Sequence, residues 1–165
     1  MATSDKINTT YIISRRLRTN WMNYIWQCAV AGFFTFLVFF VFSELIGIIV
    51  LASIGSTFFT VFALSGNRTA QPRNVIGSNV LCSLIGLACC PIHSLSLSAG
   101  VAVGAAAFLM VITDTEHPPA AGIALGLAMT QSSTLALSGA GFALAAALLA
   151  ILLKKLLSPW LKDLF

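Results

Sequence analysis

Three long stretches without a charged residue constrain this chain more than any other feature. They cover residues 24–42, 45–64 and 134–153. Each is close to the roughly 20 residues that an α-helix needs to cross about 30 Å of hydrocarbon. Only 8% of the chain is charged, whereas about a quarter is usual in a globular domain. We therefore predict an all-α fold, a polytopic transmembrane helical bundle that forms a single membrane domain over residues 1–165.

Three shorter apolar runs lie between the second and third long runs, at residues 75–90, 98–113 and 118–130. The last is too short for a straight span and is typical of a half-helix or of a span that its flanks complete. Two arrangements fit four to six membrane segments. Either all six runs cross, or four cross and residues 98–130 enter and return as a re-entrant hairpin.

The basic residues indicate the orientation. Lys6, Arg15, Arg16 and Arg18 precede the first run, Arg68 and Arg73 follow the second, and Lys154, Lys155 and Lys162 follow the last. Loops rich in Lys and Arg stay in the cytoplasm. We expect an integral protein of the bacterial inner (plasma) membrane with both termini cytoplasmic. Residues 1–20 then form a cytoplasmic or interfacial segment, 21–157 the transmembrane region and 158–165 a cytoplasmic tail.

Small residues predict where helices pack closely. Gly100 and Gly104, and likewise Gly122 and Gly126, are four positions apart, so each pair leaves one helix face open to another backbone. Tight packing within one subunit and a subunit interface both remain open for these pairs, and we expect a dimer or trimer. The phenylalanines of the first long run, by contrast, are predicted to form a wall against lipid.

Enzyme and metal chemistry have no support in the residue pattern. The four cysteines lie in apolar runs without a CxxC pair, which is typical of small buried hydrophobes. His93 and His117 lack the neighbouring ligands that a metal cluster needs. There is no Ser-His-Asp pattern and no phosphate-binding glycine loop. We expect no enzymatic activity, no metal or cofactor, and no nucleic-acid partner.

The stretch "DTEHPPAAG", residues 114–122, places acids, a histidine and two prolines in this apolar setting. Proline suits only the start of a helix and restricts the residue before it, so the prolines should end the preceding helix and begin a new one near Pro118. The positive end of that helix would face His117 and the carboxylates of Asp114 and Glu116. Membrane transporters commonly present such broken helices to anionic groups, although a plain cytoplasmic loop also fits.

A second polar break, "SGNRTAQPRN", covers residues 65–74 and again places a proline, Pro72, at a helix start. Arg73 and Asn74 then fall in the first turn. If all six runs cross, both breaks face the cytoplasm. If residues 98–130 form a re-entrant hairpin, the second break reaches membrane depth.

The motifs AQPRN (residues 70–74) and HPP (residues 117–119) together resemble the HPP family of small integral membrane proteins. The resemblance extends from about residue 21 to residue 153. It implies membrane helices, usually described as four, and nitrite transport, the activity of some members in cyanobacterial and plastid membranes. Members usually carry Gly-His where this chain has Ser78 and Asn79.

We therefore expect a transporter of a small inorganic anion, with nitrite as the candidate, in which helix N-termini line the pathway. The candidate substrate-binding residues are Gln71, Arg73, Asn74, Asp114, Glu116, His117, Pro118 and Pro119. The net charge of +4 favours an anion. Asp114 and Glu116 favour proton- or cation-coupled transport instead, because acids inside a membrane commonly relay or bind ions. A scaffold or assembly protein that transports nothing is the third hypothesis.

Overall fold

The computed structural model describes residues 15–43, 46–130 and 132–162, and these residues form helices and connecting segments without a strand. The helices are α1 (Arg15–Phe42), α2 (Ile48–Ala63), α3 (Pro72–Cys89), α4 (Leu95–Ile112), α5 (Pro118–Met129) and α6 (Ser133–Leu157). A short 3-10 turn, η1 (Arg68–Ala70), lies between α2 and α3. The predicted all-α class is confirmed. The predicted interfacial segment lies largely outside the described residues.

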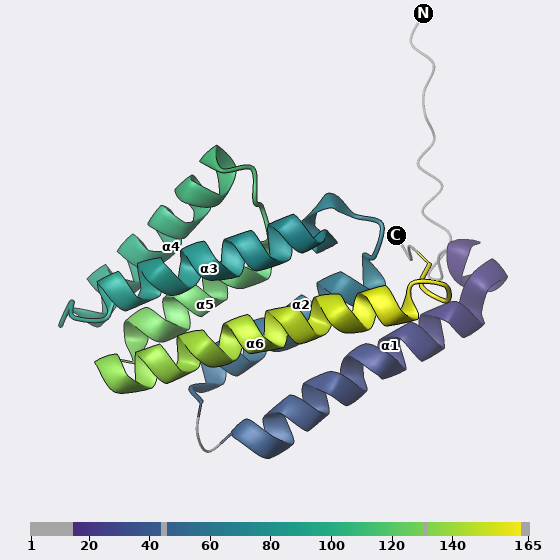
Figure 1. The fold of residues 1–165 in the computed structure, drawn as a ribbon, viewed down its shortest axis with the longest axis horizontal. Helices are drawn as coiled ribbons and strands as arrows, with labels where there is room; N and C mark the ends of the chain where they lie inside the picture. Colours follow the sequence, from purple (N-terminus) through teal and green to yellow (C-terminus); the bar gives the residue numbers. More distant parts are fainter. Residues whose placement is uncertain (1–14, 44–45, 131, 163–165) are drawn as a thin grey trace, which may run out of the picture.

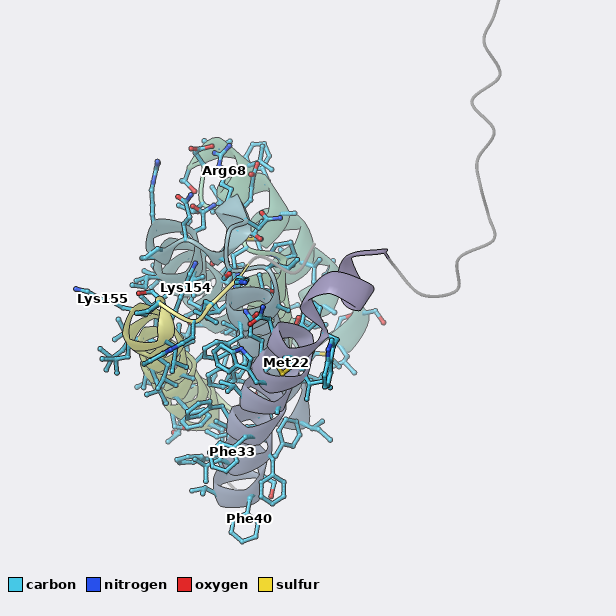
Figure 2. The ribbon with its side chains drawn as sticks, turned by 90° about the vertical axis from the view of Figure 1, so that its right-hand side faces the viewer. Met22, Phe33, Phe40, Arg68, Lys154 and Lys155 are labelled. Atoms are coloured by element: carbon cyan, nitrogen blue, oxygen red, sulfur yellow. The ribbon has the colours of Figure 1, made fainter. Side chains whose placement is uncertain are left out.

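Successive helices run in opposite directions along the long axis of the molecule, and α4 tilts away from the others (Figure 1). The starts of α1, α3 and α5 therefore lie at the same end as the last turns of α2, α4 and α6. This end carries Arg68, Lys154 and Lys155 (Figure 2). We call it the basic end, and the other the opposite end.

Helix α5 is the centre of the bundle and packs against α2, α3, α4 and α6. Glycines allow this close approach. A Cβ atom added to Gly86 of α3 would lie 2.9 Å from the Ala124 carbonyl oxygen, and one added to Gly126 would lie 3.0 Å from the Val50 nitrogen. The twelve residues of α5 extend only about 18 Å. A helix this short is held by its neighbours on all sides.

The two predicted glycine pairs differ in their surroundings. Gly122 and Gly126 face Ser53 and Val50 of α2, so this pair packs within the subunit. A Cβ atom at Gly100 or Gly104 of α4 would meet nothing within 4 Å. The face of α4 that carries Gly100 and Gly104 is therefore open.

Helix α1 lies at one edge of the bundle and packs against α2 (Figure 1). Phe33, Phe36 and Phe40 are 59%, 64% and 75% exposed, as the predicted wall against lipid requires. Phe33 and Phe40 are labelled in Figure 2. Phe34 instead stacks on Phe58 of α2, with ring centroids 5.9 Å apart. The wall thus includes only the phenylalanines on one face of α1.

Within the described residues, three helical segments are long and apolar enough to cross a membrane: Trp21–Phe42, Leu95–Ile112 and Ser133–Leu157. The predicted full span at residues 45–64 is wrong, and the run 98–113 is shorter than the helix that contains most of it. The run 45–64 yields only the 16 residues of α2, because the helix begins after Gly47 and ends before Leu64. The run 98–113 belongs to an 18-residue helix, because α4 begins directly after Ser94.

Candidate functional site

The two proline-containing motifs meet at the basic end, although about 40 residues separate them. His117 Nδ1 lies 2.8 Å from the Thr69 carbonyl oxygen. Asn74 donates from Nδ2 to the Glu116 carbonyl oxygen over 3.1 Å, and Arg73 donates from Nη2 to that of Thr113 over 3.3 Å. Residues 67–74 and 113–119 therefore form one unit, which we call the motif junction.

Each of the two segments of the motif junction contains the start of a helix. Pro72 opens α3, and Pro118 followed by Pro119 opens α5. The residues before them, Gln71 and His117, have extended backbones and make no side-chain capping hydrogen bond. The first N–H groups of an α-helix have no partner within the helix and form its positive end. Two positive helix ends are thus held together at the motif junction.

Helix α4 ends before it reaches the prolines, which differs from the prediction. Thr115 N donates to the Met110 carbonyl oxygen and Asp114 N to that of Val111, over 3.0 and 3.2 Å. Asp114 has a φ of 58°. With Asp114 in the left-handed conformation, these two bonds form a Schellman motif. Asp is one of the few residues besides Gly that tolerate this conformation. Asp114 terminates α4, and the prolines only start α5.

His117 is the most enclosed polar residue of the junction, with 0% of its surface exposed. It lies in the connecting segment between α4 and α5. Its Nε2 is 3.2 Å from Thr57 Oγ1 of α2, and that hydroxyl lies 3.1 Å from the Ser53 carbonyl oxygen. Burial lowers the pKa of His117 to about 4, against the opposing effect of the hydrogen bond to Thr69. The imidazole is therefore neutral at physiological pH.

Three charged residues of the junction, Arg68, Arg73 and Asp114, lie at its surface. Asp114 pairs with Arg68, and its Oδ2 is 3.6 Å from Nη1 of Arg73. The side chains of Arg68 and Asp114 are about half exposed and that of Arg73 is more so. Exposed pairs of this kind contribute about 0–1 kcal/mol. These ion pairs affect the local charge more than the stability of the fold.

The predicted site residues divide into two groups. Asn74 and His117 are buried inside the junction, and Glu116 and Pro119 are half-buried. Gln71, Arg73, Asp114 and Pro118 are exposed at the basic end. A cavity of about 330 Å³ opens at the opposite end, between the start of α2 and the end of α5. The candidate residues thus surround one end of α5, and the cavity lies at its other end.

Four residues outside the predicted site also support this end of the bundle. Thr57 contacts His117, and Thr69 supplies the carbonyl to its other nitrogen. Lys154 Nζ donates to the carbonyl oxygens of Ser65 and Ala70 over 2.7 and 2.8 Å. Gln27 donates to the Phe62 carbonyl oxygen over 2.8 Å. Gln27 and Thr57 could have been recognised in the sequence, because each is a polar residue inside an apolar run. A polar side chain buried there needs a hydrogen-bond partner.

Comparison with known proteins gives one match. A family model described as "HPP, transmembrane region" matches residues 16–161. Neither the curated proteins nor the solved structures include a match. The matched region contains every helix described above except the first residue of α1.

Proposed function

The chain belongs to the HPP transmembrane family, and from that premise we propose that it moves a small anion across a lipid bilayer, with nitrite as the substrate. Nitrite is the substrate that the family resemblance suggests. The proposal depends mainly on the pair of positive helix ends at Pro72 and Pro118, held together by hydrogen bonds of Asn74 and His117. Helix N-termini attract anions because their N–H groups and dipoles point outward.

In the proposed topology all six helices cross the membrane. Helices α2 and α5 are shorter than a full span, but each lies among longer neighbours, as half-helices in transporters do. The basic end faces the cytoplasm, because Lys and Arg are retained there. The motif junction is then the cytoplasmic mouth of the pathway, and the protein resides in the inner membrane of a bacterium.

The charge arrangement favours an anion over a cation. Asp114 is paired with Arg68 and Arg73, so its carboxylate is not free to bind a cation alone. Lys154 and Lys155 lie at the same end (Figure 2). A local excess of positive charge raises the concentration of an approaching anion.

A scaffold without transport activity is the second candidate. It has one observation in its favour, which is the open face of α4 at Gly100 and Gly104. Glycine pairs of this spacing are common where membrane helices associate. The same face would serve a dimer or trimer of a transporter. Oligomer formation alone therefore does not separate the two candidates.

Nitrite flux into vesicles that contain the purified protein tests the proposal. The assay is run at neutral and at alkaline pH, and protein-free vesicles give the background that leakage of the undissociated acid through the lipid produces. We expect saturable uptake that other small anions inhibit and that sodium or potassium does not require. Flux equal to the background for nitrite and for the other small anions would contradict the proposal and favour the scaffold.

A further inference from the structure

The hydrogen bonds around His117 fix which nitrogen carries its proton. Nδ1 faces the Thr69 carbonyl oxygen at 2.8 Å, and a carbonyl oxygen only accepts. Nδ1 must therefore carry a hydrogen and donate it. In the neutral ring Nε2 is then the acceptor, and it faces the hydroxyl of Thr57 at 3.2 Å.

The Thr57 hydroxyl can serve both protonation states of the ring. It has one hydrogen and two groups within reach, His117 Nε2 at 3.2 Å and the Ser53 carbonyl oxygen at 3.1 Å. When the imidazole is neutral, Thr57 donates to Nε2. When Nε2 is protonated, it donates to Thr57 Oγ1, and the hydroxyl hydrogen turns to Ser53. A rotation of one hydroxyl thus keeps every donor paired in a buried site, where an unpaired polar group is costly.

Few other groups near this site can titrate or carry charge. Helices α2 and α5 contain no acidic or basic residue. Helix α3 contributes Arg73 and the η1 turn Arg68, and both pair with Asp114. From α6, Lys154 donates to backbone carbonyls. Glu116, which precedes His117 in the chain, is the remaining carboxylate of the junction.

We propose that His117 takes up a proton together with the transported anion, and that Thr57 is the positioning residue that lets the buried ring hold this proton. The proposal rests on the anion transport proposed above. It specifies the coupling, which is one proton per anion and no net charge moved.

The physical reason is the cost of charge in a buried site. A lone anion or a lone imidazolium is strongly disfavoured there, whereas the two together are neutral and attract each other. Burial lowers the pKa of His117 to about 4, so at neutral pH the empty protein carries the ring hydrogen on Nδ1 and no proton on Nε2. An anion beside the ring raises that pKa. By linkage, protonation strengthens anion binding by the same factor.

The proton balance of a cycle is simple. A proton from water forms an N–H bond at Nε2 as the anion enters, and the hydroxyl of Thr57 turns toward Ser53. On the other side of the membrane the N–H bond breaks, the proton returns to water, and the anion leaves. The neutral ring then accepts from Thr57 again. No electron is transferred, and no other reactant is needed.

Vesicle transport under a controlled membrane potential tests the coupling. In vesicles clamped with potassium and valinomycin, neutral cotransport predicts that the initial rate of nitrite uptake stays the same at positive, zero and negative potential. A trapped pH dye should show proton entry with nitrite at a ratio near one. An inward gradient of one pH unit should drive about tenfold accumulation, since one unit is a factor of ten in proton concentration. Protein-free vesicles correct for leakage of the undissociated acid.

Matched variants assign the roles of the side chains. Thr57→Val removes the hydroxyl while keeping the side-chain shape, and we expect proton-coupled uptake to fall at least tenfold; Thr57→Ser should restore most of it. Thr60→Val is the control, because the Thr60 hydroxyl bonds only within α2, to the Ser56 carbonyl oxygen. His117→Gln should abolish proton entry. In Glu116→Gln the number of protons that enter per nitrite should stay near one, whatever its uptake rate, and a loss of proton entry with nitrite uptake retained would assign the proton to Glu116 instead.

A spectroscopic measurement does not depend on transport. The chain has two histidines, so nitrogen NMR of a His93→Gln variant observes His117 alone. We expect the form protonated on Nδ1 at neutral pH, and a pKa that rises when nitrite is added and does not rise in Thr57→Val. A pKa that nitrite leaves unchanged would contradict the coupling.

The vesicle experiments distinguish an absence of proton coupling from an absence of anion transport. Nitrite uptake that depends on membrane potential and brings no proton would keep the transporter and remove the coupling. No uptake at any pH or potential would remove both.

Discussion

Asn74 in the first turn of α3 donates its Nδ2 hydrogen to the Glu116 carbonyl oxygen over 3.1 Å, and so ties the start of α3 to the residue before His117. Asn74 is only 2% exposed. Loss of this bond leaves the half-buried Glu116 carbonyl without this donor, which costs up to about 1–3 kcal/mol. We expect Asn74→Ala to lower the melting temperature and to reduce nitrite uptake strongly.

Asn79→Ala is the matched control for Asn74. Asn79 is equally buried on the same helix, but its Nδ2 donates to the Val75 carbonyl oxygen within α3. Its loss should affect stability with a much smaller effect on uptake per folded molecule. Equal losses of uptake in the two variants would show that the connection between the motifs has no special role.

Gly122 tests the contact between α5 and α2. A Cβ atom at this position would clash with Ser53 Oγ. Overpacking of this kind typically costs about 1–3 kcal/mol, so Gly122→Ala should lower the thermal stability. The double variant Gly122→Ala with Ser53→Gly should recover part of the loss, because it removes the obstructing atoms.

Gly104→Ala is the control for this substitution, since a Cβ atom at Gly104 would meet nothing within 4 Å. It should be neutral or slightly stabilising in a monomer, because Ala favours a helix over Gly. Thermal unfolding in detergent measures the stability of Gly122→Ala and of Gly104→Ala. A stable Gly122→Ala protein would mean that α2 and α5 are less closely packed than described here.

Asp114 tests the surface charges of the motif junction. Asp114→Asn keeps a residue that tolerates the left-handed backbone and removes the charge that pairs with Arg68 and Arg73. We expect a several-fold lower KM for nitrite at low salt, and less change at high salt, since screening weakens exposed charges.

Arg73→Gln should change KM in the other direction, and Arg73→Lys should restore the wild-type value if charge alone matters. Thermal stability should change by no more than about 1 kcal/mol in any of these variants, because the side chains are largely exposed. A KM that is unchanged in both Asp114→Asn and Arg73→Gln would exclude these residues from the entry route of the anion.

The stability of the protein should depend on pH through His117. Its pKa is about 4 in the folded protein and 6.5 as the reference value. The unfolded chain therefore binds the proton more readily, so folding is favoured most above pH 6.5. Stability should fall as the pH decreases from 6.5 to 4, by at most about 1.4 kcal/mol per pH unit.

Thermal unfolding in detergent at pH 7.5, 5.5 and 4.5 measures this dependence. His117→Gln should be less stable at pH 7.5 but should lose less stability on acidification. His93→Gln, at an exposed position, should behave like the wild type. A wild-type protein with the same pH dependence as His117→Gln would contradict the neutral buried ring.

The topology can be tested by cysteine labelling. After replacement of the four native cysteines, single cysteines are placed at Thr113 and Ser94, which are exposed at the basic and opposite ends. An impermeant reagent outside the cell should label position 94 and not position 113. Reporters fused to both termini should be cytoplasmic. Labelling of position 113 from outside would overturn the orientation proposed for α4.

Much of the fold followed from the sequence. The apolar runs predicted helices, and prolines at 72 and 118 predicted the starts of α3 and α5, because proline fits the first turn of a helix. The end of α4 was misassigned to the prolines. The Schellman motif at Asp114 could not be recognised, since it depends on backbone conformation and on hydrogen bonds to Met110 and Val111.

By itself the sequence determined the all-α class, the basic end and the two polar breaks, because composition, charge and proline positions act locally along the chain. Only the tertiary structure decided that the breaks join through Asn74 and His117, that Gly122 packs on α2 while Gly104 stays open, and that Thr57 contacts the histidine. These relationships connect residues 40 to 70 positions apart. They depend on how helices of different lengths pack around α5, and no local pattern in the sequence contains that information.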